Sequence, residues 1–579
     1  MTKVEQKLRN HWYLIVIMLI GTLITLPQLN HQATIIGADG LFHFNRFYDV
    51  AMQIKNHNFS YFMQLYGFLN SGRIVTAVYS PLITYIFGLI LLLCNSFYKF
   101  EIFTRFAFFI LSGLSMKYAL KMAQIKNQFM IQLVCVVYAF SPAVIRWDAS
   151  QNFTSIGAML IPLVAGCGMR MINNQAKPIN WVQLGVIMAI VVQTHLATAM
   201  QSILLLTVYA AMALIENPEG RKELLKNGIY AALLCTILSL NVVAGMLELY
   251  RGNYIIPIVQ FDFADGHGIY HLTQIFSGQW VNLFFVLIVF TTLICFFRKL
   301  SLAMRVTGLL SLTLFLVATG IFIDWPAVMD AVPLLRIVLQ FPARLVAPAA
   351  VLSLITVASI GDFPMAMGFL KLLRCGLTYL LIFFLLVNMR SNFRYNRSAS
   401  SNVLESERTT IPRVKQTSAL AEHVTMLMKR PLNHEDIEYL TKSTSDYMPS
   451  NQLMDNAAYG EYQNKIILPS KSGDFQKQVG YHKIIVTWKS NGGDVNIPVA
   501  YYRNTRFKLN GSSLVPRVAE GIIKVPRIKS HTGKNILEVT YQPDKISTVF
   551  LKSAITSWVL LLGGAILGLI KKLRTQFKK

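Results

Sequence analysis

Long apolar runs alternate with short polar stretches along the first 390 residues. A helix needs about 20 mostly apolar residues to cross the hydrocarbon core of a bilayer. The pattern therefore predicts a polytopic α-helical membrane protein with 12 or 13 transmembrane helices. The apolar segments are 12–29, 79–95, 100–120, 129–145, 153–172, 180–194, 196–215, 228–247, 280–297, 302–323, 343–360, 367–389 and 549–570.

Clusters of Lys and Arg orient these helices, because cytoplasmic loops are enriched in basic residues. The clusters lie at both termini and near 117–126, 170–177, 221–226 and 298–305. If all of them are cytoplasmic, 79–95 and 100–120 cannot both be complete spans. The outer side then carries 30–78, 144–152, the neighbourhood of His195, 248–279, 324–342 and 391–547. The protein is expected in the plasma membrane, with both termini in the cytoplasm.

The chain changes character after the membrane domain of residues 1–390. Residues 391–547 are rich in Ser, Thr, Asn, Lys and Arg, which predicts an extracellular soluble domain. Its second half alternates polar and apolar residues between turn signals such as Asn510-Gly511, a pattern typical of strands. We expect a β-rich, sandwich-like domain with strands at 483–488, 496–502, 506–509, 521–525 and 536–541. A C-terminal transmembrane helix (548–570) and a basic cytoplasmic tail (571–579) follow.

Composition narrows the class of protein further. Of the 579 residues 54% are hydrophobic and only 14% are charged, against about 25% charged in an average soluble domain. The net charge of +26 is explained by cytoplasmic loops and lipid headgroups, so nucleic acid is not an expected partner. All six cysteines lie in or beside apolar segments. An exported domain without cysteine suits a Gram-positive bacterium. No CxxC, HExxH, Walker A or GxGxxG motif occurs.

The first outer loop holds the strongest candidate for chemistry. Asp39, His43 and Arg46 stand at i, i+4 and i+7, which places them on one face of a helix. A carboxylate there could deprotonate an acceptor hydroxyl, while the two other groups could hold a phosphate. The alternative is a helix start with an acid matched to the helix dipole.

Other polar residues stand at the predicted outer ends of helices. Asp148 follows Arg146 beyond a helix end, either as a functional acid or beside an interfacial anchor. His195 is either functional or caps a helical hairpin. Arg344 opens a helix, where a cation is unfavourable without an anion nearby; a bound phosphate or a lipid headgroup would supply one.

A polar loop further along has groups able to bind metal. Its residues are Asp262, Asp265, His267 and His271. Their spacing matches no metal signature, so no metal site is predicted from it.

Short motifs in a fixed order give the chain a family resemblance. Asp39-Gly-Leu-Phe-His43-Phe-Asn-Arg46 and the later Tyr79-Ser80-Pro81 resemble the first outer loop of bacterial YfhO-like and pyruvoyl-tetrahydropterin-synthase-related membrane proteins. The later motifs, in the same order, are Ser141-Pro142 with Arg146 and Asp148, Thr194-His195 with Thr198, Phe341-Pro342-Ala343-Arg344 and Tyr447-Met448-Pro449. Ala343 stands where that family usually has Trp. The family's pterin-related label has no counterpart here.

The resemblance implies a membrane glycosyltransferase of the GT-C architecture. Such enzymes take sugars from polyprenyl-phosphate donors on the outer face of a membrane. By this resemblance Asp39 is the catalytic acid and Asp148 a second one, and the lipid phosphate is held by His43, Arg46, Arg73, His195 and Arg344. The expected acceptor is a cell-envelope polymer such as teichoic acid or polysaccharide, or a lipid. Members of the class differ in using a divalent cation, so a metal requirement stays open.

Two other functions fit a polytopic protein with an outer domain. A lipid-linked glycan transporter, or flippase, needs polar groups deep in both leaflets. A non-enzymatic envelope scaffold would work through residues 391–547 and tolerate changes at Asp39. The polar motifs gather on one predicted side, which favours the transferase.

Overall fold

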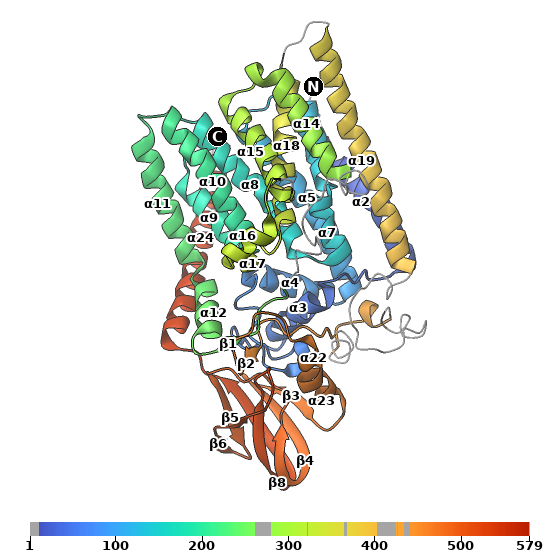
Figure 1. The fold of residues 1–579 in the computed structure, drawn as a ribbon, viewed down its shortest axis with the longest axis vertical. Coiled ribbons are helices and arrows are strands. Elements are labelled where there is room, and N and C mark those ends of the chain that lie inside the picture. The colour runs from blue at the N-terminus through green and yellow to red at the C-terminus, as the bar shows by residue number, and fades with distance from the viewer. Residues whose placement is uncertain are drawn as a thin grey trace.

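A computed structural model describes residues 11–260, 280–320, 322–363, 368–401, 424, 426–433 and 441–577 of the chain. The polar loop with Asp262, Asp265, His267 and His271 lies outside the described residues. Figure 1 shows three layers: a bundle of long helices, a middle layer around helices α3 and α4, and a β-sheet at the far end. Both chain ends lie at the end of the bundle opposite to the sheet.

Helices make up most of the structure. Those of the bundle and the middle layer are α2 (Trp12–His31), α3 (Gly40–Lys55), α4 (Pro81–Cys94), α5 (Phe97–Met122), α6 (Gln128–Ala139), α7 (Pro142–Ser150), α8 (Phe153–Asn173), α9 (Trp181–Val192), α10 (Leu196–Glu216), α11 (Arg221–Leu238), α12 (Leu240–Tyr250), α14 (Trp280–Phe296), α15 (Leu302–Ala318), α16 (Trp325–Ala331), α17 (Leu334–Val338), α18 (Val346–Ala358), α19 (Phe369–Ser401) and α24 (Lys545–Phe577). Short helices α22 (Tyr459–Tyr462) and α23 (Leu468–Lys471) precede the sheet.

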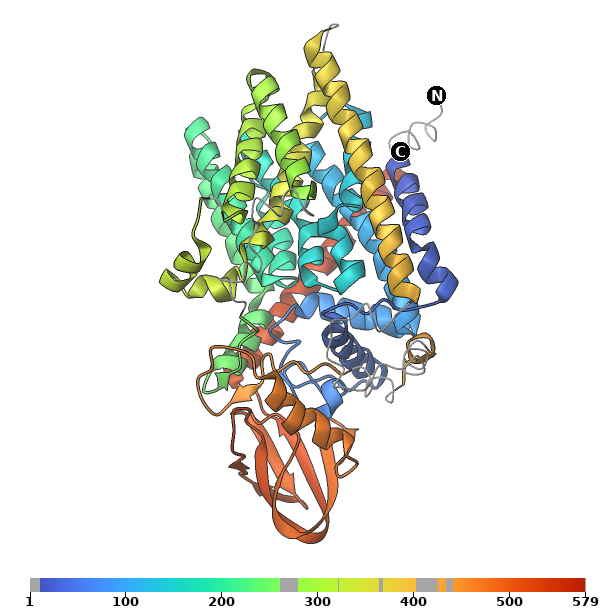
Figure 2. The same cartoon turned by 45° about the vertical axis from the view of Figure 1, so that its right-hand side comes forward.

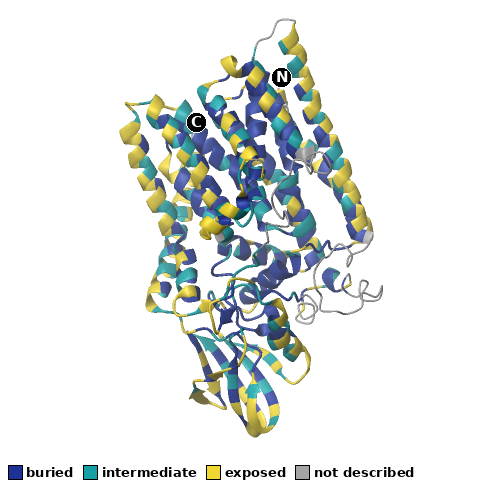
Figure 3. Ribbon diagram, viewed as in Figure 1, coloured by how far each residue is buried: buried dark blue, intermediate teal, exposed yellow. Residues whose placement is uncertain are grey.

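The helical part confirms a polytopic membrane protein. Among the described residues eight helices are long and apolar enough to cross a membrane, or nine if the bent pair α11–α12 is one span. Three shorter apolar helices accompany them. Figure 3 shows exposed residues along the outer faces of the bundle and buried residues inside it, as expected of helices that face lipid. Figure 2 shows α24 running from the sheet to the far end of the bundle.

Helix α4 resolves the conflict between the two neighbouring apolar segments. Its 14 residues extend about 21 Å at 1.5 Å per residue, less than the roughly 30 Å of hydrocarbon. Figure 1 places it beside α3 in the middle layer. The following helix α5 has 26 residues and is long enough to cross. Of the two segments, 79–95 therefore holds a helix too short to be a complete span.

The β-rich domain is confirmed, with differences in its strands. Its sheet has the order β3-β4-β8-β5-β6, and β7 pairs with β8. The strands are β3 (Gln476–Gly480), β4 (Lys483–Asn496), β5 (Thr505–Leu509), β6 (Ser512–Leu514), β7 (Arg517–Val518) and β8 (Pro526–Tyr541), all antiparallel. A separate two-stranded ladder joins β1 (Tyr254–Ile255) to β2 (Pro449–Ser450).

Two predicted strands are wrong. Most of 496–502 and all of 521–525 lie outside the strands, because their apolar side chains pack against the middle layer: Ala500 and Ile523 belong to its core. Ala500 N donates to Ser71 O at 2.8 Å instead of to a sheet neighbour.

The sandwich-like shape comes from one sheet that folds over. The indole nitrogen of Trp488 donates to Ser530 Oγ at 3.0 Å, although Trp488 is paired in register with Asn535. Five residues of flat strand would separate the two groups by about 17 Å. Between them Gly492, Gly493 and Gly533 have positive φ, a conformation that glycine adopts without strain. The two halves of β4 and β8 thus enclose one core.

Hydrogen bonds fix the sheet to the helical part. Glu248 of α12 accepts from the Asn504 amide at 2.9 Å, the Tyr541 hydroxyl at 2.7 Å and Asp544 N at 2.8 Å. The Lys477 ammonium of β3 donates to the first outer loop at Leu69 O, 2.9 Å away. These contacts place the sheet against α12 and the first outer loop.

Candidate functional site

Asp39 stands at the entrance of α3 and not on its face. It is the residue before the first turn, and its side chain does not cap the helix. His43 N donates to Asp39 O at 3.0 Å, which starts the helix. The predicted spacing of Asp39, His43 and Arg46 therefore holds only for the last two as members of the helix.

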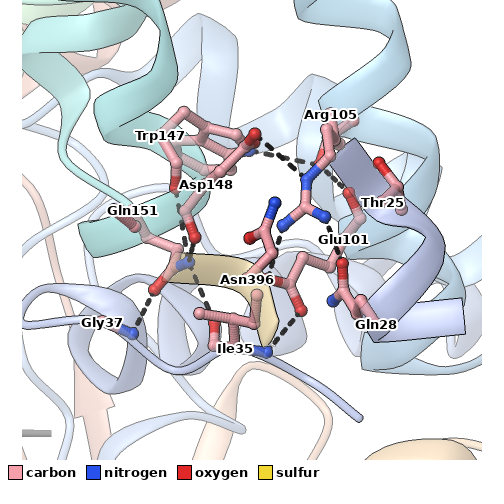
Figure 4. Close-up of polar contacts among 12 residues, drawn as sticks. Thr25, Gln28, Ile35, Gly37, Glu101, Arg105, Trp147, Asp148, Gln151 and Asn396 are labelled. Carbon is pink, nitrogen blue, oxygen red and sulfur yellow. Dashed lines mark hydrogen bonds and ion pairs between the residues drawn. The ribbon is translucent and has the colours of Figure 1, made fainter. Parts of the chain in front are cut away.

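The loop that carries Asp39 is held by a buried polar cluster, drawn in Figure 4. Glu101 accepts from Ile35 N at 2.9 Å, and the Gln151 side chain accepts from Gly37 N and donates to Ile35 O at 3.0 Å. Asp39 N donates to Ser150 O at 3.0 Å. A Cβ on Gly37 would lie 2.2 Å from Ser150 Cα, so only glycine fits there. The position of Asp39 is thus fixed by backbone contacts with α7.

Asp148 belongs to this supporting cluster. Its Oδ2 lies 3.1 Å from Arg105 Nε, and Arg105 Nη2 lies 3.7 Å from Glu101 Oε1. All three side chains are at most 4% exposed. The Gln28 side chain also accepts from Arg105. The structure therefore separates Asp148 from Asp39 and pairs it with Arg105, a cation within the apolar segment 100–120 that the sequence analysis did not single out.

His43 and Arg46 form a buried pair on the inner face of α3. Arg46 Nη1 lies 2.9 Å from His43 Nδ1, and Arg46 Nη2 donates to Tyr79 O and Thr84 Oγ1. The guanidinium carbon lies 4.8 Å from the centre of the Tyr79 ring. Burial and then the Arg46 charge hold the pKa of His43 well below its usual range. His43 is therefore neutral at pH 7, and only Arg46 of this pair brings positive charge.

Arg344 and Lys442 supply the charge next to Asp39. Burial raises the pKa of Asp39, and Lys442 followed by Arg344 lowers it. Lys442 also donates to Ala38 O. The guanidinium of Arg344 donates to the side-chain oxygen of Gln340, and its central carbon lies 4.6 Å from the centre of the Phe341 ring. The site thus combines one carboxylate with two cations from distant parts of the chain.

Tyr79 marks the centre of the candidate site. Burial raises its pKa to about 12, and the charges of Asp39, Arg46, Arg344 and Asp446 all act on it. The His195 ring lies 6.5 Å from the Tyr79 ring. His195 Nδ1 lies 2.9 Å from Thr198 Oγ1 and accepts from Thr198 N. His195 therefore caps α10, and it also lies beside the site.

Asp446 is an acid that the sequence analysis missed. Burial raises its pKa to about 6, Arg73 and Lys442 lower it, and Asp39 raises it. Its Oδ1 is buried without a hydrogen-bond partner. The motif Tyr447-Met448-Pro449 directly follows it, so the resemblance had pointed to this segment without naming the carboxylate.

Arg73 is occupied in holding that same segment. Its guanidinium donates to Thr444 O at 2.9 Å and to Asp446 O. It also packs on Phe68 at 4.4 Å and on Tyr462 at 4.9 Å. Arg73 is fully buried, so these contacts assign it a supporting position one layer behind Asp446.

The predicted residues thus divide into two groups. Asp39, His43, Arg46, His195 and Arg344 converge around Tyr79, and Lys442 and Asp446 complete the ring. Asp148 and Arg73 support it from either side. Among the described residues no three His, Cys, Asp or Glu side chains form a group able to hold a metal ion.

Buried polar atoms without a hydrogen-bond partner indicate which ligand groups the ring around Tyr79 can bind. Arg46 Nε, Arg344 Nε and Asp446 Oδ1 are buried without a partner. Unpaired donors on guanidinium groups suit an anion such as a phosphate. An unpaired carboxylate oxygen suits a hydroxyl.

No protein-family model matches the sequence, and no curated protein matches it. Solved structures of one protein are similar. The archaeal oligosaccharyltransferase AglB from Archaeoglobus fulgidus, in complex with an inhibitory peptide and a dolichol-phosphate, has 10% identity and a TM-score of 0.40, covering 77% of this chain and 61% of that one. The Archaeoglobus fulgidus enzyme tethered to an acceptor peptide has a TM-score of 0.41 at 10% identity, covering 78% and 60%. The chain spans about 60% of the length of these structures. This degree of similarity assigns neither family nor activity.

Proposed function

We propose that the chain is a membrane glycosyltransferase that moves a sugar from a polyprenyl-phosphate donor to a cell-envelope polymer outside the cell membrane. The observation that carries the proposal is the ring around Tyr79, where one acid with a raised pKa, Asp39, lies beside Arg344 and Lys442. The sequence resemblance to YfhO-like proteins supports the same class.

The proposed reaction is a single displacement at the sugar. The acceptor hydroxyl oxygen forms a bond to the anomeric carbon, the bond from that carbon to the phosphate oxygen breaks, and polyprenyl phosphate leaves with the electron pair. Asp39 takes the hydroxyl proton as general base. One base acting opposite the leaving group gives inversion of configuration.

Charge stabilisation of the leaving phosphate is the second part of the mechanism. Arg344, Lys442 and Arg46 bring three cations to the ring, and electrostatic stabilisation is usually the largest catalytic term. The His43 imidazole, neutral at pH 7, orients Arg46 rather than adding charge. Asp446 offers a carboxylate oxygen for a second hydroxyl of the acceptor.

The raised pKa of Asp39 fits the role of base. A base works best when its pKa approaches the working pH, and burial moves Asp39 in that direction. Lys442 and Arg344 act in the opposite direction and lower the pKa of Asp39, which favours the ionised carboxylate. Asp148, paired with Arg105, is not assigned a catalytic role.

The test uses the purified chain with a radiolabelled polyprenyl-phosphate sugar and cell-wall acceptor. Asp39→Asn is expected to lower transfer by about 100-fold or more, within the range for a general base, at unchanged unfolding temperature. Asp330→Asn is the control, because Asp330 is exposed and pairs only with Arg336 near the surface. Full transfer by Asp39→Asn would refute the assignment. Movement of labelled lipid across vesicles without transfer would support a flippase instead.

A further inference from the structure

The outer face of the folded sheet carries a cluster of cations with almost no acids. Alternation along the strands places Lys483 and Lys489 of β4, Lys534 of β8, and Arg506 and Lys508 of β5 on the face opposite to the core. This set is called the basic face below. Lys489, Lys534, Arg506 and Lys508 are exposed. Residues 474–544 hold eleven Lys and Arg but five Asp and Glu.

The register of the strands places like charges opposite each other, which costs free energy. Lys489 lies directly opposite Lys534 in the ladder between β4 and β8, and like charges in that position repel. The one acid on the face, Glu538, lies opposite Lys508 but pairs with Lys483 at 2.6 Å. At least three of the five cations therefore have no acid across the ladder.

Edge protection does not explain these lysines. Charged residues often guard the open edge of a sheet against pairing with other chains. β3 ends opposite Thr487 and β5 ends opposite Leu537, so Lys489 and Lys534 lie on a two-stranded part of the ladder with open sides. A Lys facing a Glu would guard those sides equally well, so edge protection does not account for two like charges directly opposite each other. A binding partner that neutralises them would explain the register.

We infer that the basic face binds an extended anionic polymer with repeating phosphate or carboxylate groups. Lys489 and Lys534 lie on neighbouring strands about 4.8 Å apart, and Arg506 and Lys508 lie further along the same face. Cations spread over the face in this way suit repeated charges better than a single small anion. Lipid headgroups are a poorer match, because Figure 1 places β4 and β8 at the end of the molecule farthest from the helical bundle.

Position adds a role to this surface. The sheet contacts the first outer loop, where Asn58 Nδ2 donates to Gly480 O at 2.9 Å and Lys477 reaches Leu69 O. A polymer held on the basic face would therefore lie on the same side of the helical bundle as the first outer loop. Binding itself needs no sugar transfer, so this inference stands whether or not the proposed activity does.

The experiment measures binding of fluorescent poly(glycerol phosphate) to the full chain in nanodiscs, with neutral dextran as a second probe. Lys489→Gln/Lys534→Gln is expected to weaken binding by about 10-fold or more in about 0.15 M salt, where charges act over roughly 8 Å. The matched control is Arg517→Gln/Lys529→Gln, which removes two cations from the same sheet off the basic face; less than about 2-fold change is expected.

Folding is checked by the unfolding temperature, which should not fall in Lys489→Gln/Lys534→Gln because a repulsion is removed. Equal weakening by both double variants would overturn the inference in favour of net charge alone. Equal binding of dextran, or binding that persists in about 1 M salt, would also overturn it. So would binding of anionic lipid vesicles, but not of the polymer, that depends on Lys489 and Lys534.

Discussion

Charge balance in the buried cluster of Glu101, Arg105 and Asp148 predicts which of these residues can be replaced with little loss of stability. Two acids share one cation, and all three side chains are at most 4% exposed. Asp148→Asn leaves Glu101 and Arg105 as a balanced pair. Arg105→Met leaves two carboxylates with no cation between them.

The two substitutions should therefore lower the free energy of unfolding by different amounts. Removing one partner so that a buried charge is uncompensated costs about 3–5 kcal/mol, which we expect for Arg105→Met. Losing one hydrogen-bonded contact while the charges stay balanced costs about 1–2 kcal/mol, which we expect for Asp148→Asn. Sugar transfer by Asp148→Asn should remain within a few fold of the parent at temperatures well below unfolding.

The cysteines provide the assay. Cys135 and Cys167 are buried and free, so a thiol-reactive dye labels them only as the bundle opens. The exposed Cys375 and the partly exposed Cys94, Cys235 and Cys295 are replaced by Ser in every variant to remove the background. The midpoint of labelling on heating should fall slightly for Asp148→Asn and much further for Arg105→Met. An unchanged midpoint with lost transfer in Asp148→Asn would show that Asp148 acts in the chemistry, and equal midpoints would refute the charge balance.

Three further predictions concern Asp39. Because burial raises its pKa above the ordinary 3.8 and only the ionised form is a base, the transfer rate measured against pH should fall on acidification at a pH above that of an ordinary aspartate. Lys442→Met removes the cation that lowers this pKa most, so the acid limb should move to higher pH; an unmoved limb would mean that another group titrates. Gly37→Ala forces a Cβ to 2.2 Å from Ser150 Cα, and a displacement of about 1 Å can cost about 100-fold in rate; initial rates beside labelling midpoints would separate this from unfolding.

The periodicity of apolar residues predicted most of the helical part. Its one conflict, between segments 79–95 and 100–120, was itself informative, because the shorter helix α4 lies in the middle layer. Local patterns could also predict that His43 and Arg46 share a helix face. They could not predict that Asp39 stands before the helix, because that depends on backbone contacts with Ser150, more than 100 residues away in the chain.

The residues that the sequence analysis missed share one property. Lys442 and Asp446 come to the site from about 400 residues beyond Asp39, and no local spacing records such a contact. Arg105 had a detectable signal, since an ionisable residue inside an apolar segment needs a buried partner. Following that signal would have paired Arg105 with Glu101 or Asp148 and removed Asp148 from the catalytic candidates.

The acids near the first outer loop can be sorted by what satisfies them, and this sorting isolates Asp39 and Asp446. Asp49 accepts from Leu65 N at 2.8 Å, Tyr66 N at 2.7 Å and the Gln53 amide at 2.7 Å, so it folds the loop. Asp148 has Arg105. By contrast, the Asp39 carboxylate does not cap α3 and Asp446 Oδ1 is buried without a partner. A buried unpaired polar group costs about 1–3 kcal/mol. Binding one hydroxyl of the acceptor would offset that cost for Asp446, and Asp39 would take the proton of a second hydroxyl, the one that attacks the sugar.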